Sequence, residues 1–200
     1  MNEPFIDYMK RELSDDVVLI ACGLPASYKT ETTEVISRLK GYPILRTDLI
    51  RKEVLKGEDI FDEKVASNMD KRNLVYDEMF AQAFNAAEKG KGVILDATFI
   101  TQKLRLRAAE VAAKAGKTLV IQQTICPQEV SLKRILRRTK EKYESNALTE
   151  QAYLNNKNKF EAVDIKELKA AFPSLSVIHL TIDTASDDEN NWRVIGRREI

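Results

Sequence analysis

The stretch "VVLIACGLPASYKTETTEVISRL", from Val17 to Leu39, decides the fold class. It opens with an apolar run of the kind found in strands that are buried on both faces of a sheet. A turn containing Gly23 follows, and beyond it Val35, Ile36 and Leu39 recur with helical spacing. This order of strand, glycine turn and helix is typical of a phosphate-binding loop, where backbone N–H groups and a helix N-terminus converge on an anion.

The turn matches the P-loop pattern G-x-x-x-x-G-K-[ST] at all but one of its defined positions. Gly23, Lys29 and Thr30 agree with the pattern, and Tyr28 stands where it has a second glycine. The lysine supplies a point charge for the outer phosphates, and the threonine hydroxyl can bind Mg²⁺. A non-glycine residue forced to positive φ costs roughly 1–3 kcal/mol. The sequence therefore leaves three interpretations open: a working loop, a loop with weakened phosphate binding, or a strand–turn–helix junction with an incidental lysine.

The rest of the chain alternates between short apolar runs and helical patterns. Further strand candidates are Tyr42–Arg46, Gly92–Ala97, Thr118–Gln123 and Leu175–Leu180. Helical spacing runs from Val65 to Ala87 and from Leu104 to Ala115, and Ser186 with Glu189 is typical of a capping box that starts a last helix. Such alternation predicts a three-layer α/β/α fold with a five-stranded, mostly parallel sheet.

Composition excludes several classes of protein. The chain has 200 residues, enough for one domain over residues 1–200, and its net charge of +1 gives no global field for nucleic acid or membrane. Cys22 and Cys126 are too few for a disulfide framework or a zinc site. The N-terminus lacks the apolar core of a signal peptide, and no apolar stretch is long enough for a membrane span. We expect a cytoplasmic protein with no membrane partner and no obligate protein partner.

Two carboxylates follow strand candidates, at the sheet edge where ligands of such folds collect. Asp48 comes after the second strand and can accept a proton from an attacking hydroxyl, and Arg51 shares its helix face. The alternative is a helix-capping aspartate beside a surface arginine. Asp96 follows the apolar run that opens "GVILDATF" and fits a ligand of Mg²⁺, or else an aspartate at a helix junction. Arg46, Arg51, Lys52 and Lys56 gather near this side and favour an anionic acceptor.

A basic segment, "SLKRILRRTKEK", extends from Ser131 to Lys142. A run of charge is usually a solvated helix face, and we interpret Lys140 and Lys142 in that way. Arg134 and Arg138 are spaced i, i+4 on one face, and their planar guanidinium groups suit the spread charge of a transferring phosphoryl group.

Taken in order, "GLPASYKT", "LRTDLIRKEV", "VILDATF" and "KRILRRTKEK" resemble the P-loop kinase group that includes phage polynucleotide 5′-kinases, zeta-type toxins and chloramphenicol phosphotransferases. The resemblance implies ATP and Mg²⁺ as cofactors, Asp48 as general base, and Arg51 steadying the acceptor or phosphoryl group. It also implies a small helical lid, at about residues 134–150, that carries Arg134 and Arg138. The group usually reads G-x-P-G-S-G-K, so Ala26 and Tyr28 both replace glycines.

The function predicted from the sequence is an ATP-dependent phosphotransferase acting on a hydroxyl of a small molecule or polynucleotide end. The alternative is a non-catalytic nucleotide-binding or regulatory protein with a degenerate loop. The predicted nucleotide-binding residues are Gly23, Leu24, Pro25, Ala26, Ser27, Tyr28, Lys29 and Thr30. The predicted catalytic residues are Lys29, Asp48, Arg51, Arg134 and Arg138, and the predicted Mg²⁺ ligands are Thr30 and Asp96.

Overall fold

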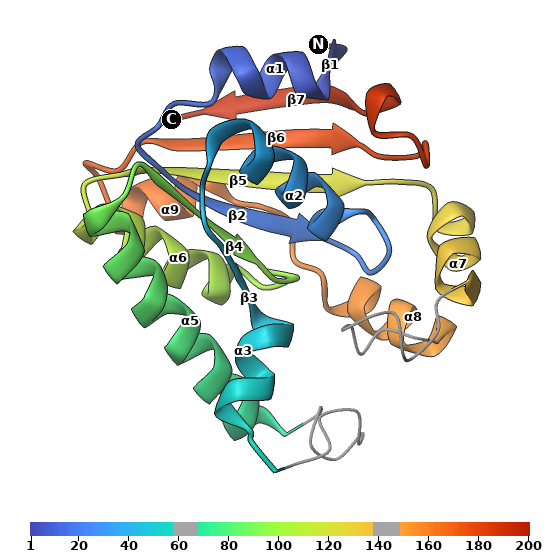
Figure 1. The fold of residues 1–200 in the computed structure, drawn as a ribbon, viewed down its shortest axis with the longest axis horizontal. Coiled ribbons are helices and arrows are strands. Elements are labelled where there is room, and N and C mark those ends of the chain that lie inside the picture. The colour runs from blue at the N-terminus through green and yellow to red at the C-terminus, as the bar shows by residue number, and fades with distance from the viewer. Residues whose placement is uncertain (58–67, 138–148) are drawn as a thin grey trace.

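A computed structural model describes residues 1–57, 68–137 and 149–200 (Figure 1). Its centre is a sheet in which the described residues form seven strands in the order β1-β7-β6-β5-β2-β4-β3. The parallel strands are β2 (Val17–Gly23), β3 (Ile44–Arg46), β4 (Gly92–Asp96), β5 (Thr118–Ile125) and β6 (Val177–Asp183). All five strands expected from the sequence are therefore confirmed, and they run parallel as predicted.

The sheet is wider than predicted because two antiparallel strands extend one edge. They are β1 (Glu3–Pro4) and β7 (Arg193–Glu199), and β7 pairs with β6. The prediction of a last helix after Ser186 is wrong. The segment instead makes a short 3₁₀ turn, η1 (Glu189–Asn191), in which the Asn190 backbone N–H donates to Asp188 Oδ1, and the chain then enters β7. Asp and Ser side chains that bond nearby amides favour turns as readily as helix starts, so the capping pattern alone does not separate the two.

Helices cover both faces of the sheet, which gives the three predicted layers (Figure 1). On one face lie α5 (Met69–Lys89), α6 (Gln102–Lys114) and α9 (Ile165–Ala171), and on the other lie α1 (Phe5–Glu12) and α2 (Lys29–Lys40). Alternate residues of β2 enter the two cores: Val18 and Ile20 pack with α5 and α6, and Leu19 packs with α1 and α2. A strand buried on both faces reads as a continuous apolar run, as this one does.

Three further helices lie beyond the carboxyl ends of the parallel strands (Figure 1). They are α3 (Thr47–Val54), α7 (Gln128–Arg137) and α8 (Glu150–Lys159). Most of the predicted lid, including Arg138, lies outside the described residues, as does Val65, where the first helical pattern was expected to begin. Among the described residues, no helix has the length and apolar character needed to cross a membrane.

The loop after β4 is held by a buried arginine that the sequence did not reveal. Arg105, on α6, is fully buried and donates to the carbonyl oxygens of Phe99 (3.0 Å), Glu161 (2.7 Å) and Ala162 (3.0 Å). Carbonyl oxygens satisfy the donors of a buried guanidinium without a carboxylate partner. This arrangement fixes the turn that follows Asp96, and it therefore helps to set the sheet edge where the candidate site is found.

Candidate functional site

The loop between β2 and α2 keeps the backbone of a glycine-rich loop although two of its glycines are replaced. Ala26 has φ 59° and Tyr28 has φ 58°, both in the left-handed region. Such angles cost a residue with a Cβ about 1–2 kcal/mol. The substitutions have therefore changed the side chains at these two positions while leaving a left-handed backbone there.

Gly23 cannot be replaced in the same way. It has φ 147°, and a Cβ at this position would lie 2.6 Å from both the carbonyl oxygen and the Oγ1 of Thr124 on β5. The glycine retained from the motif is therefore the one that a neighbouring strand requires.

The loop carbonyls are held by side chains from several elements. Leu24 O accepts from Lys29 Nζ at 2.8 Å and from Ser27 Oγ at 2.7 Å. Ser27 O accepts from Thr184 Oγ1 at 2.9 Å, and Ala26 O accepts from the Arg134 guanidinium at 3.2 Å. The first-turn N–H groups of a helix have no intrahelical acceptor, so the amides at the start of α2 remain the groups that this loop offers to an anion.

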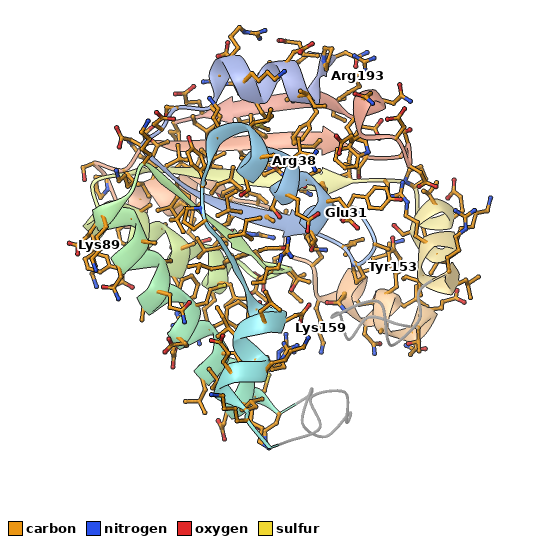
Figure 2. The ribbon with its side chains drawn as sticks, in the orientation of Figure 1. Glu31, Arg38, Lys89, Tyr153, Lys159 and Arg193 are labelled. Atoms are coloured by element: carbon orange, nitrogen blue, oxygen red, sulfur yellow. The ribbon has the colours of Figure 1, made fainter. Side chains whose placement is uncertain are left out.

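The Ala26 methyl group packs beneath the loop. It is buried in a small cluster with Ile135 of α7 and Tyr153 of α8, which is labelled in Figure 2. Burying one methyl group stabilises the fold by about 0.8 kcal/mol, which offsets much of the backbone cost at Ala26.

Tyr28 is held by three side chains. The Arg134 guanidinium carbon lies 3.7 Å from its ring centroid, the Trp192 ring lies 5.6 Å away, and its hydroxyl donates to Asp187 at 2.8 Å. Burial and then the Asp187 carboxylate raise the pKa of Tyr28 to about 12, so the hydroxyl stays a donor at neutral pH. A cation–π contact and an aromatic pair each contribute about 0.5–1.5 kcal/mol, which is enough to offset the strained backbone.

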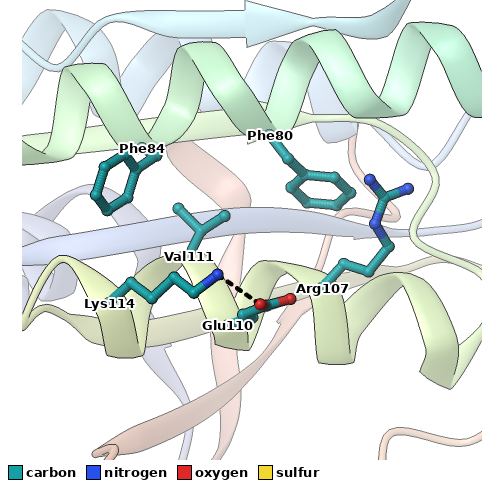
Figure 3. A pocket seen from close by; sticks show the side chains of 6 residues that line it. All are labelled: Phe80, Phe84, Arg107, Glu110, Val111 and Lys114. Atoms are coloured by element: carbon teal, nitrogen blue, oxygen red, sulfur yellow. Dashed lines mark ion pairs between the residues drawn. The ribbon is translucent and has the colours of Figure 1, made fainter.

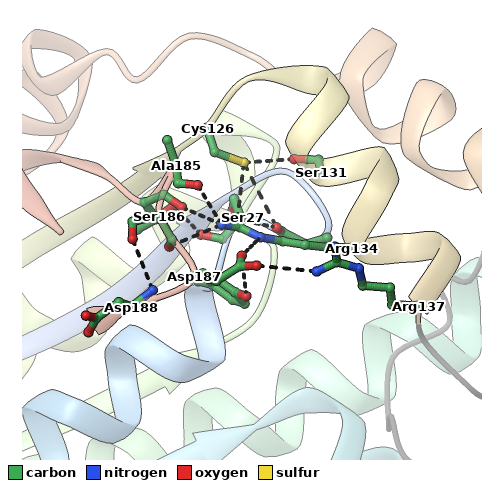
Figure 4. Close-up of polar contacts among 12 residues, drawn as sticks. Ser27, Cys126, Ser131, Arg134, Arg137, Ala185, Ser186, Asp187 and Asp188 are labelled. Atoms are coloured by element: carbon green, nitrogen blue, oxygen red, sulfur yellow. Dashed lines mark hydrogen bonds and ion pairs between the residues drawn. The ribbon is translucent and has the colours of Figure 1, made fainter. Parts of the chain in front are cut away.

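Arg134 belongs to this support. It is buried and donates to the carbonyl oxygens of Thr184, Ala185 and Ser186 at 2.9–3.2 Å, and to Asp187 Oδ1 at 2.9 Å (Figure 4). These bonds join α7 to the P-loop and to the segment after β6. The role at the phosphoryl group expected for Arg134 requires the side chain to leave these partners. Arg138, its expected companion, lies outside the described residues.

Thr30 and Asp96 meet beside the loop. Asp96 is buried at the end of β4; its carboxylate lies near the Thr30 hydroxyl and the Lys29 ammonium, and accepts from Arg46 Nε at 3.2 Å. Burial raises the pKa of Asp96, and its donor and cationic neighbours oppose that rise. A hydroxyl and one carboxylate form a donor set that fits Mg²⁺, which keeps several waters and takes further ligands from phosphates. The described residues contain no cluster of three or more His, Cys, Asp or Glu suited to a metal.

Asp48 and Arg51 come together in the first turns of α3, at the end of β3. Arg51 Nη1 lies 2.8 Å from Asp48 Oδ1, and the Asp48 side chain is 32% exposed. Asp48 is not the capping residue, because the helix begins after Arg46. Buried Tyr76 of α5 lies near Thr98 and close to this pair. The positive cluster expected here is partly neutralised, since Arg46 and Arg51 both pair with carboxylates.

A hollow lies between α5 and α6 (Figure 3). It measures about 450 Å³, and the charged groups at its rim pair locally: Glu110 with Lys114 at 2.7 Å, and Arg107 with Asp77, which lies outside the lining. Arg107 also lies 4.5 Å above the ring of Phe80. These contacts explain the hollow as a feature of helix packing, and we assign it no ligand.

Comparison with known proteins places this geometry in a family. A family model described as "AAA domain" matches residues 18–163, which include the loop, both acidic positions and α7. The chain belongs to this family. A search of curated proteins finds no match.

Solved structures share the fold of this AAA domain. A gluconokinase from Sinorhizobium meliloti 1021 has 16% sequence identity and a TM-score of 0.55, with 86% of this chain and 84% of that chain covered. A sugar kinase from Janibacter sp. HTCC2649 has 17% identity and a TM-score of 0.54, with 82% and 83% covered. At these identities the likeness establishes the fold alone.

Sequence reasoning missed the residues that support the loop of this AAA domain from a distance. Trp192 and Asp187 come from the C-terminal segment, as does Thr184, whose hydroxyl donates to Ser27 O. One signal of such support is present in the sequence: Tyr28 replaces a loop glycine, and an aromatic ring at this position needs side chains to pack against. Which partners it has depends on the pairing of β6 with β7, and no local pattern predicts that pairing.

Proposed function

We propose that this protein is an ATP-dependent phosphotransferase that moves the γ-phosphate of ATP to a hydroxyl group of a small molecule or a polynucleotide end. The observation that carries the proposal is the left-handed backbone at Ala26 and Tyr28, which preserves a phosphate-binding loop despite the missing glycines. Glycine adopts these angles without steric cost, so the path of the loop backbone is kept although the side chains have changed.

The chemistry follows from the residues around the loop. Amides at the start of α2 and the Lys29 ammonium would bind the phosphate chain. Thr30 and Asp96 would hold Mg²⁺, which supplies positive charge against the phosphates when it is bound.

Asp48 would take the proton of the attacking hydroxyl, and Arg51 would hold that carboxylate in place. The acceptor oxygen bonds to the γ-phosphorus, the bond from that phosphorus to the bridging oxygen breaks, and ADP leaves. In such reactions positioning and charge account for most of the rate enhancement.

The acceptor class is the open part of the proposal. The two similar structures described above are a gluconokinase and a sugar kinase, which makes small polyhydroxylated molecules the first acceptors to test. The polynucleotide kinases, zeta-type toxins and chloramphenicol phosphotransferases that the sequence motifs resemble add nucleic-acid ends, nucleosides and antibiotics. The alternative of a non-catalytic nucleotide-binding protein rests on the strained residues in the loop.

The experiment has two stages. Melting with millimolar ATP and Mg²⁺ tests binding, and we expect stabilisation that Lys29→Ala removes. Transfer of labelled γ-phosphate to sugars, nucleosides, antibiotics and nucleic-acid ends tests turnover. Asp48→Asn should suppress transfer while ATP binding persists, and Glu53→Gln, at an exposed acid on the same helix, is the matched control. No stabilisation by ATP would defeat the proposal; binding without transfer or hydrolysis would favour the non-catalytic alternative.

A further inference from the structure

Arg46 links two acidic side chains at the edge of the sheet. It is the last residue of β3, its Nε lies 3.2 Å from Asp96 Oδ2, and its Nη2 lies 2.7 Å from Glu34 Oε1. The three side chains form a gradient of burial, with 5% of Asp96, 22% of Arg46 and 47% of Glu34 exposed. The guanidinium group therefore spans from a buried carboxylate to one at the surface.

The backbone brings this linkage about. Arg46 and Asp96 are direct partners in the parallel pairing of β3 with β4. Glu34 lies four residues after Thr30 on α2, so the two share one face of that helix. Arg46 thus connects the carboxylate at the end of β4 to the helix that carries Lys29 and Thr30.

We propose that Arg46 is a positioning residue that holds the Asp96 carboxylate beside Thr30, and that Glu34 in turn holds Arg46. The inference rests on the proposed function, because it assigns Arg46 to the residues that would bind the metal with ATP. Arg46 holds one oxygen of Asp96, and the Thr30 hydroxyl lies near the same carboxylate, so the guanidinium limits how the carboxylate can turn. A planar guanidinium suits this task because it donates along fixed directions to two partners at once.

Charge alone predicts the opposite outcome, and this makes the inference testable. Glu34, Arg46 and Asp96 together carry a net charge of −1. Replacing Arg46 with methionine makes the group −2, which strengthens the attraction for a divalent cation. If positioning dominates, the same variant binds the metal more weakly. Loss of a partner that orients a metal ligand typically reduces metal affinity by about 10–100-fold.

The experiment measures ATP affinity by calorimetry over a series of free Mg²⁺ concentrations and in excess EDTA. For Arg46→Met we expect the Mg²⁺ concentration at half-maximal enhancement of ATP binding to rise by about tenfold, with affinity in EDTA unchanged. Arg46→Lys keeps the charge but lacks the fork, so it should recover only part of the loss. Arg38→Met is the matched control, since Arg38 lies on α2 in an exposed pair with Glu189 at 2.9 Å (Figure 2).

The possible outcomes separate this inference from the proposed function. A wild-type protein with no Mg²⁺-dependent ATP binding would overturn both. A normal wild type with an unchanged or lowered Mg²⁺ requirement in Arg46→Met would overturn the positioning role alone. Should Arg46→Met fail to fold, Glu34→Gln carries the test, because it alters an exposed partner and leaves Asp96 paired. We expect that variant to raise the Mg²⁺ requirement by less than the roughly tenfold effect of Arg46→Met, and no change would contradict the inference.

Discussion

Substitution of Tyr28 by alanine and by glycine tests the backbone on which the site depends. Alanine removes the ring and its contacts but keeps a Cβ at φ 58°. Glycine removes both the contacts and the steric cost. If the loop has the left-handed conformation, the glycine variant is the more stable of the two by about 1–2 kcal/mol.

The size of each effect follows from the contacts of the side chain. The Arg134 stack, the Trp192 pair and the bond to Asp187 each contribute on the order of 1 kcal/mol, so Tyr28→Ala should lower the free energy of unfolding by about 3 kcal/mol. Tyr28→Gly regains the steric cost and should lose about 1–2 kcal/mol. In a chain of this length 1 kcal/mol moves Tm by about 2–4 °C. Tyr28→Phe keeps the ring and should lose only the hydrogen-bond contribution.

The assay is urea unfolding without nucleotide, with Tm as a second readout. An alanine variant as stable as the glycine variant would refute the left-handed loop. A glycine variant more stable than the wild type would show that the ring contacts do not compensate for the strain. Because the ring supports the loop, we also expect Tyr28→Gly to bind ATP more weakly than the wild type; tighter binding would identify the ring as an obstacle.

Three other substitutions test separate parts of the structure. Gly23→Ala should abolish ATP binding, because its Cβ would lie 2.6 Å from the backbone of Thr124; unchanged calorimetric affinity would contradict this close packing. Arg134→Met should destabilise the fold by about 3–5 kcal/mol, since buried polar partners are left unpaired, whereas exposed Arg137→Met should cost under 1 kcal/mol; equal losses in urea unfolding would refute the supporting role. Burial lowers the pKa of His179, the single histidine, to about 4, so the unfolded chain binds its proton first and stability falls as pH drops from about 6.5 to 4. His179→Gln should flatten this part of the profile by up to about 3 kcal/mol, and an unaltered slope would contradict the assignment.

Much of the fold could be predicted because apolar patterning fixes burial. The run at β2 is buried on both faces, and that burial reveals a central parallel strand before any contact is known. Strand β7, next to the two-residue edge strand β1, carries three arginines and a glutamate around one buried residue, Val194, so its pattern is too weak to compete with the acidic turn before it. Strands at or near the edge of a sheet are less buried, so they lack the continuous apolar run by which a central strand is recognised in the sequence.

The site was predictable where a motif fixes the backbone and unpredictable where long-range contacts decide. The positions of Lys29, Thr30 and Asp96 follow from strand ends in a parallel sheet, and the structure brings all three together. The sequence shows Arg46 and Arg134 only as positive charges. Their partners come from distant segments, and these contacts change what the charges can do: one holds a carboxylate and the other holds the loop. The cytoplasmic location expected from the sequence stays a prediction.

The most direct test of the central claim is the melting temperature of the wild-type protein and of Lys29→Ala with and without ATP and Mg²⁺. A loop that wraps its amides around the phosphates predicts stabilisation of about 2.7 kcal/mol when ATP is at 100 times its Kd, or roughly 5–11 °C in Tm, and none in the variant. A wild-type melting temperature that is the same with and without millimolar ATP would contradict the account, because the loop would then have its left-handed backbone but no longer bind phosphates.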